Sequence, residues 1–167
     1  MAEHPNFMME YNGTWYTLEE LGKVLEPIYR EYEVRIQDCI SGLTQYAAGQ
    51  AARGREAQLP ELRKLITNMA EFWNLDHDES KYGYLKLREK YGGAFDRAVA
   101  AARASGQAPS LSREAQGNIL SGLELYAKEM TDSGGLEPWV EQCGALAEQF
   151  QEEWTEAEPQ MGGLTLG

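Results

Sequence analysis

The sequence predicts a mainly α protein, a helical bundle of five to six helices with a short N-terminal β-hairpin. Apolar residues recur at alternating spacings of three and four along most of the 167 residues, which is the period of an amphipathic helix. Glycine and proline clusters cut this pattern into segments of helical length. We therefore expect one helical domain over residues 1–156 and a flexible tail over residues 157–167.

A β-hairpin is predicted over residues 7–16. Asn12 and Gly13 stand between two short apolar and aromatic runs, and both residue types tolerate the positive φ angles of a type I′ turn. Because an isolated two-stranded hairpin is marginal in water, we expect its aromatic side chains to pack on the helices. These side chains are Phe7, Tyr11, Trp15 and Tyr16.

The first helix is expected to start after Thr17, which forms a capping-box pattern with Glu20. Pro27 is predicted to end or kink this helix and to open the next one, because proline lacks a backbone N–H but suits a first helical turn. The second helix then runs to about residue 52. Its apolar stripe comprises Tyr32, Ile36, Cys39, Leu43 and Tyr46.

Pro60 opens the third predicted helix, and the fourth begins near Ser80. We place Tyr84 on the inward face of the fourth helix and expect a kink or break at Gly92 and Gly93. The fifth helix covers about 112–131. The sixth begins at Pro138 and ends near residue 156.

The sixth helix has the clearest amphipathic pattern in the chain. At 100° per residue, its apolar side chains fill one arc and its glutamates fill the opposite arc. The apolar arc comprises Trp139, Val140, Cys143, Leu146, Ala147, Phe150 and Trp154, and the acidic arc comprises Glu137, Glu141, Glu148, Glu152 and Glu156.

Charge is distributed unevenly along the chain. The formal net charge is −12, and all fifteen Lys and Arg residues lie at or before Lys128. The last 39 residues hold nine acids and no base, whereas residues 81–104 hold six bases and two acids. Such asymmetry indicates something about partners rather than about the fold.

Three interpretations of the acidic face follow: a solvated surface, a docking face for a basic partner, or a clasp onto the basic middle of the same chain. We favour a non-enzymatic interaction protein, an inhibitor or adaptor that docks on a basic protein or nucleoprotein surface, with imitation of nucleic acid as one variant of this hypothesis. The residues assigned to partner binding are Glu137, Glu141, Glu148 and Glu152, with Trp139 and Trp154 as anchors.

An alternative is a small helical structural subunit of a nucleoprotein assembly that contacts nucleic acid through Lys86, Lys90 and Arg97. The segments ELRKLI, YLKLREKYG and LELYAKEM, in this order, resemble the small helical subunit of type III CRISPR effector complexes. The hairpin followed by TLEEL looks like the start of some phage tail assembly chaperones. The overall negative charge argues against direct nucleic-acid binding.

A second alternative is an enzyme centred on His77, which stands between Asp76 and Asp78. Supporting catalytic groups are scarce, and neither a phosphate-binding loop nor a metal-binding motif is found, so we expect no cofactor and no metal. Cys39 and Cys143 fall on apolar faces and are expected to be buried, reduced thiols.

The sequence also bounds the compartment. No apolar run approaches the ~20 residues that span a bilayer, and the first ten residues lack the pattern of a secretory signal. We therefore expect a cytoplasmic protein without membrane contact. Whether the chain forms homo-oligomers is left open.

Overall fold

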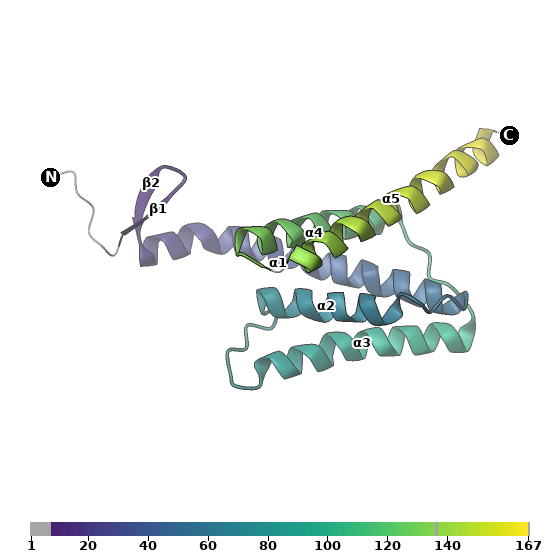
Figure 1. The fold of residues 1–167 in the computed structure, drawn as a ribbon, viewed down its shortest axis with the longest axis horizontal. Helices are drawn as coiled ribbons and strands as arrows, with labels where there is room; N and C mark the ends of the chain where they lie inside the picture. The colour runs from purple at the N-terminus through teal and green to yellow at the C-terminus, as the bar shows by residue number, and fades with distance from the viewer. Residues whose placement is uncertain (1–7, 136, 167) are drawn as a thin grey trace. The chain divides into compact units, whose positions relative to one another are not determined.

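The computed structural model describes the backbone of residues 8–135 and 137–166 and the side chains of these residues up to Thr155. Within this part of the chain the predicted fold class is confirmed, with a β-hairpin followed by five helices (Figure 1). The chain divides into two compact units, residues 1–34 and 35–167. The elements are β1 (Met8–Tyr11), β2 (Thr14–Thr17), α1 (Leu18–Ala52), α2 (Leu59–Trp73), α3 (Gly83–Ser105), α4 (Arg113–Asp132) and α5 (Glu137–Leu166).

The hairpin forms as predicted, although Phe7 lies outside the described residues. Strands β1 and β2 pair antiparallel, with Met8 opposite Thr17 and Tyr11 opposite Thr14. The turn residues Asn12 and Gly13 have φ angles of 53° and 83°. Both angles lie in the left-handed region that a type I′ turn requires, and this is why the turn uses Asn-Gly.

The predicted capping box at the start of α1 is also confirmed. The backbone N–H of Glu20 donates to Oγ1 of Thr17 at 3.2 Å, and the backbone N–H of Thr17 donates to Oε1 of Glu20 at 2.9 Å. The hydrogen bond from the Thr17 backbone lowers the pKa of the Glu20 carboxyl, because it stabilises the ionised form. Two free backbone donors at the helix start are thereby satisfied.

Pro27 does not end the helix or open a new one, because α1 is one helix from Leu18 to Ala52 with Pro27 inside it, and a kink at Pro27 stays a prediction. The apolar stripe continues on both sides of the proline and favours a continuous helix. In the second unit this stripe is buried in the core: Ile36, Cys39 and Leu43 are fully buried.

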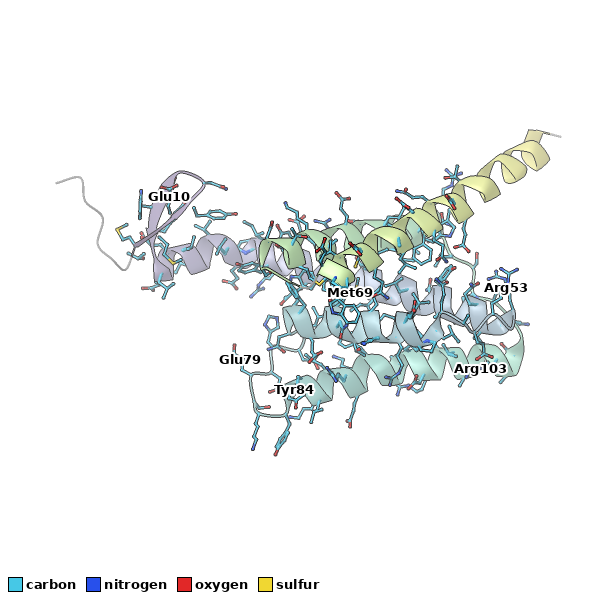
Figure 2. All side chains as sticks on the ribbon, in the orientation of Figure 1. Glu10, Arg53, Met69, Glu79, Tyr84 and Arg103 are labelled. Carbon is cyan, nitrogen blue, oxygen red and sulfur yellow. The ribbon has the colours of Figure 1, made fainter. Side chains whose placement is uncertain are left out.

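The remaining helices pair two by two in the second unit. Helix α2 packs along α3, and α4 packs along α5 (Figure 1). Each helix contributes a buried stripe to the core, in which Met69 of α2 is fully buried (Figure 2). The largest fully buried side chains are Ile36, Leu43, Leu62, Leu65, Ile66, Met69, Leu87, Ile119, Leu123 and Phe150.

Small residues allow α1 and α4 to approach closely. A Cβ added at Gly122 of α4 would lie 2.5 Å from Sγ of Cys39, and one added at Gly42 of α1 would lie 2.6 Å from Cγ1 of Ile119. Neither space accommodates a methyl group. The thiol of Cys39 also donates to the Ile119 carbonyl at 3.5 Å, so a side chain of α1 contacts the backbone of α4 directly.

Helix α3 runs through Gly92 and Gly93 without the break that the sequence suggested. Gly92 is buried, and a Cβ there would lie 2.7 Å from the guanidinium of Arg63 on α2. Arg63 passes over this glycine and makes a bidentate ion pair with Asp96, with both N–O distances at 3.0 Å. A side chain at position 92 would have to displace the guanidinium of Arg63 from this place.

Two further predictions differ from the structure. Tyr84 was expected in the core but is 49% exposed. Helix α5 continues past its expected end near residue 156 to Leu166, and whether residues 157–167 behave as a flexible tail stays a prediction. Among the described residues, none of the helices is both long and apolar enough to cross a membrane.

Candidate functional site

The glutamates that the sequence assigned to partner binding lie together on the exposed side of α5. Glu137, Glu141, Glu148 and Glu152 are all exposed. At 100° per residue they fall within an arc of about 60°, so their side chains leave the helix on one side. We call these four residues the acidic row.

The opposite side of α5 is held in the core. Cys143, Leu146 and Phe150 are buried there, and both predicted anchor tryptophans are half-buried. Trp154 stacks on Phe150 with ring centroids 4.9 Å apart, while the ammonium group of Lys64 lies 4.8 Å from the ring of Trp139. These contacts fasten the helix, and α5 therefore presents the acidic row in one orientation.

A cluster of hydrogen-bonded polar side chains also holds α5 against α1 and the residue before α2. The Tyr46 hydroxyl donates to the Glu153 carboxylate at 2.9 Å and accepts from the Gln149 amide at 3.4 Å. Gln149 and Gln58 exchange two amide hydrogen bonds of 2.8 and 3.0 Å. Burial and the neighbouring Glu153 carboxylate both raise the pKa of Tyr46, so the hydroxyl keeps its proton and remains a donor. Glu153 is thus structural and does not belong to the acidic row.

The acidic row has no ion-pair partner among the described side chains. The basic residues of the middle of the chain pair with acids near them in space instead, as Arg103 at the end of α3 does with Glu56 (Figure 2). The other such pairs are Arg63–Asp96, Lys86–Asp78, Arg88–Glu71 and Lys90–Asp76. These contacts argue against a clasp between α5 and the basic middle.

The alternative nucleic-acid residues are largely occupied. Lys86 lies 3.3 Å from a carboxylate oxygen of Asp78, and Lys90 lies 2.7 Å from one of Asp76. The hydrogen bond to Asp76 raises the pKa of Lys90. Arg97 is exposed and forms no ion pair with a described residue. A surface whose lysines are already neutralised attracts phosphates weakly.

The groups considered for catalysis differ in their exposure to solvent. His77 is exposed in the loop after α2 and has a positive φ of 53°. Both cysteines are buried and unbridged. Burial raises the pKa of Cys143 to about 11 and that of Cys39 further, which keeps both thiols protonated and unreactive. Within the described part of the chain, no cluster of His, Cys, Asp and Glu is arranged to hold a metal ion.

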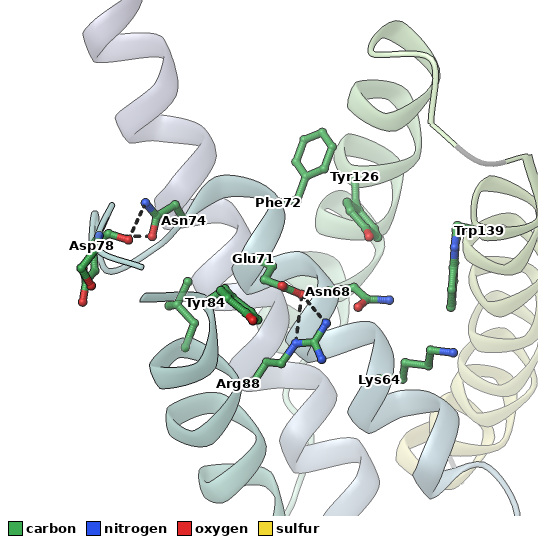
Figure 3. Close-up of a pocket in the computed structure, with 12 residues that line it drawn as sticks. Lys64, Asn68, Glu71, Phe72, Asn74, Asp78, Tyr84, Arg88, Tyr126 and Trp139 are labelled. Carbon is green, nitrogen blue, oxygen red and sulfur yellow. Dashed lines mark hydrogen bonds and ion pairs between the residues drawn. The ribbon is translucent and has the colours of Figure 1, made fainter. Parts of the chain in front are cut away.

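The structure contains a second feature, whose residues the sequence did not identify although its Trp and Tyr content left a pocket between helices open: a cleft of about 690 Å³ lined by parts of α2, α3, α4, α5 and the loop after α2 (Figure 3). Its α2 side includes Lys64, Asn68 and Glu71, whose spacing puts them on one helix face, together with Phe72. This helical spacing is the feature of the sequence that could have indicated a polar side of the cleft. The other side of the cleft is formed by residues distant in sequence, among them Tyr84 and Trp139.

Comparisons of this chain with protein-family models, curated proteins and solved structures found no match. The functional argument therefore depends on the geometry of the molecule.

Proposed function

We propose that this chain is a non-enzymatic interaction protein whose acidic row docks on a basic surface of another protein. The observation that carries the proposal is the exposure of four glutamates on one side of α5 with no cation beside them among the described side chains. Like charges at i and i+4 destabilise a helix slightly, and Glu137 with Glu141 and Glu148 with Glu152 are two such pairs. A basic partner removes this repulsion on binding.

The way α5 is held supports a docking role. Phe150, Trp139 and Trp154 fasten one side of the helix, so the row is preorganised and little side-chain or helix order is lost on association. Charge complementarity then contributes mostly to the association rate and to partner choice. A rigidly held helix with a row of exposed glutamates suits an inhibitor or adaptor that binds a basic protein.

The spacing of the row favours a basic protein surface over imitation of DNA. The four glutamates are spread over residues 137–152, about 22 Å at 1.5 Å rise per residue, or roughly one charge every 7 Å. A DNA strand carries one charge every ~3.4 Å. The row has about half that linear charge density, which matches a patch of a few Lys and Arg residues.

The test compares three proteins as baits in lysate of the native cell: the wild type, an α5 variant and a matched control. The α5 variant carries Glu141→Lys, Glu148→Lys and Glu152→Lys. The control carries Glu79→Lys, Glu89→Lys and Glu124→Lys, three exposed acids outside α5 that make no ion pair with described residues and give the same net charge. We expect a basic protein to be captured by the wild type and the control and lost with the α5 variant.

The captured partner should then bind purified wild type more weakly as salt rises, because exposed charges are screened beyond about 10 Å at 0.1 M salt. Circular dichroism confirms that each variant is folded. If the three baits capture the same proteins in equal amounts, the acidic row is a solvated surface and the proposal is wrong.

A further inference from the structure

The cleft between α2, α3, α4 and α5 has the dimensions and lining of a small-molecule site. Its volume of about 690 Å³ falls within the range of ligand pockets, roughly 300–1,000 Å³. Figure 3 shows Asn68 and Glu71 of α2 in the middle of the cleft, with Tyr84 of α3 to one side and Trp139 of α5 to the other. All of these elements lie in the second unit.

Aromatic and apolar side chains form much of the wall. Phe72 and Tyr84 are 41% and 49% exposed, although large hydrophobic residues of a bundle are usually covered. Tyr126 also lines the cleft, and its ring contacts Phe72 edge-on with the centroids 5.6 Å apart. Leu87 is a buried apolar residue of the same lining. A flat aromatic ligand could therefore make both stacked and edge-to-face contacts with these rings.

The charged side chains of the lining, Lys64, Arg88, Glu71 and Asp78, sum to zero, but both carboxylates already have a cation partner. Arg88 is paired with Glu71 at 3.2 Å, and Asp78 is paired with Lys86 at 3.3 Å. Lys64 lies over the Trp139 ring at 4.8 Å but has no carboxylate partner among the described residues. Because Asp78 pairs with Lys86 from outside the lining, the ammonium group of Lys64 is left for a ligand carboxylate, which favours a ligand with a single negative charge.

The positions of Lys64 and Arg88 argue against a cationic ligand in this cleft. An aromatic-lined cleft with two carboxylates suits a cationic ligand in principle. Here Lys64 already lies over Trp139, and Arg88 lies 6.0 Å from the ring of Tyr84 while also binding Glu71. A cationic ligand would have to displace both, so the electrostatics select an anion.

The side-chain amide of Asn68 is available for hydrogen bonds to a ligand in the cleft. Its side chain is half-buried and faces the cleft between Lys64 and Glu71, and it makes no hydrogen bond to any described residue. The amide can donate to a ligand oxygen and accept from a ligand N–H at once. Together with the ammonium group of Lys64, one helical turn away, it forms a polar part of the cleft beside Trp139 and across from Tyr84.

We propose that this cleft binds a small aromatic carboxylate, with the ring between Tyr84, Phe72 and Trp139 and the carboxylate on Lys64 and Asn68. The inference is independent of the acidic row, because none of those four glutamates lines the cleft and the charge it uses has the opposite sign. Phosphate-bearing ligands fit less well, since a second negative charge would meet the carboxylates of Glu71 and Asp78.

The test measures binding of benzoate, 1-naphthoate and indole-3-acetate by calorimetry and by ¹⁵N NMR, each beside its uncharged amide. We expect at least one carboxylate to bind, to shift the indole N–H resonance of Trp139 and the side-chain amide of Asn68, and to bind about tenfold more tightly than its amide. A Trp139→Phe spectrum assigns the indole resonance.

Lys64→Met keeps the apolar stem of the side chain and removes the charge. It should weaken carboxylate binding about tenfold and leave amide binding unchanged. The matched control is Lys81→Met, which removes a lysine that also lies over a ring, that of Tyr82 at 5.5 Å, but outside the cleft. This control should bind as the wild type does.

Three results would overturn the proposal. The first is that no carboxylate shifts Trp139 or Asn68 at millimolar concentration. The second is that each carboxylate and its amide bind equally. The third is that Lys64→Met and Lys81→Met give the same affinity as the wild type.

Discussion

At the scale of single residues, burial decides which reactive groups are available. Cys143 occupies an apolar position on α5, where loss of water disfavours the thiolate and raises its pKa to about 11. Cys39 is enclosed between α1 and α4, with its thiol on the Ile119 carbonyl. Each cysteine therefore serves as a small core residue rather than as a nucleophile.

This burial predicts the behaviour of the thiols toward a thiolate-specific reagent. At about pH 8, neither cysteine should react in the folded protein, whereas two thiols per chain should react in urea, where the pKa returns to ~8.5. The native state favours the protonated thiol, so its contribution to stability is complete below pH ~8.5 and decreases as the pH rises toward 11. Colorimetric thiol titration measures both states. Rapid reaction of one thiol in the folded chain would contradict the assigned burial.

At the scale of elements, two glycines of α4 have opposite roles. Gly122 faces Cys39 on α1, and a Cβ there would overlap the cysteine side chain. Gly117 is exposed on the same helix, and nothing lies within 4 Å of a Cβ added there. The first is required for helix packing, and the second only weakens the helix.

Gly122→Ala should therefore lower the free energy of unfolding by about 1–3 kcal/mol, since an inserted methyl group forces the two helices apart. Gly117→Ala should raise it by about 0.5–1 kcal/mol through helix propensity alone. Urea denaturation followed by circular dichroism measures both changes. Equal effects from the two substitutions would mean that α1 and α4 are not in close contact at Gly122.

At the scale of the whole molecule, charge is separated by position. The cations of the basic middle are largely neutralised by acids of α2 and its flanking loops, while the acidic row is left to solvent. Part of the net charge of −12 is therefore concentrated on one side of α5, where the four glutamates repel one another. Such concentrated repulsion is relieved by dissolved salt.

The melting temperature of the wild type should rise by a few degrees between about 0.02 and 0.2 M NaCl, because screening weakens this repulsion. The Glu141, Glu148 and Glu152 charge-reversal variant should show a smaller rise than the Glu79, Glu89 and Glu124 control, although both have a net charge of −6. Calorimetry at a series of salt concentrations measures the slopes. Identical slopes would show that total charge, and not its clustering, governs the salt effect.

The sequence alone determined the features that depend on neighbouring residues. Asn12 and Gly13 specify the turn, Thr17 and Glu20 specify the start of α1, and the spacing of glutamates along α5 specifies the acidic row. Each depends on backbone preferences or on one helix period, so a single segment carries the information.

Only the tertiary structure decided the features that join distant segments. It showed that Lys86 and Lys90 are occupied by acids of the loop after α2 and that Tyr84 is exposed rather than buried. It also brought Lys64 and Trp139 together in a cleft. Periodicity reveals that a helix has an apolar side but not which neighbour covers each turn, because helix pairing depends on side-chain shapes along every packed face.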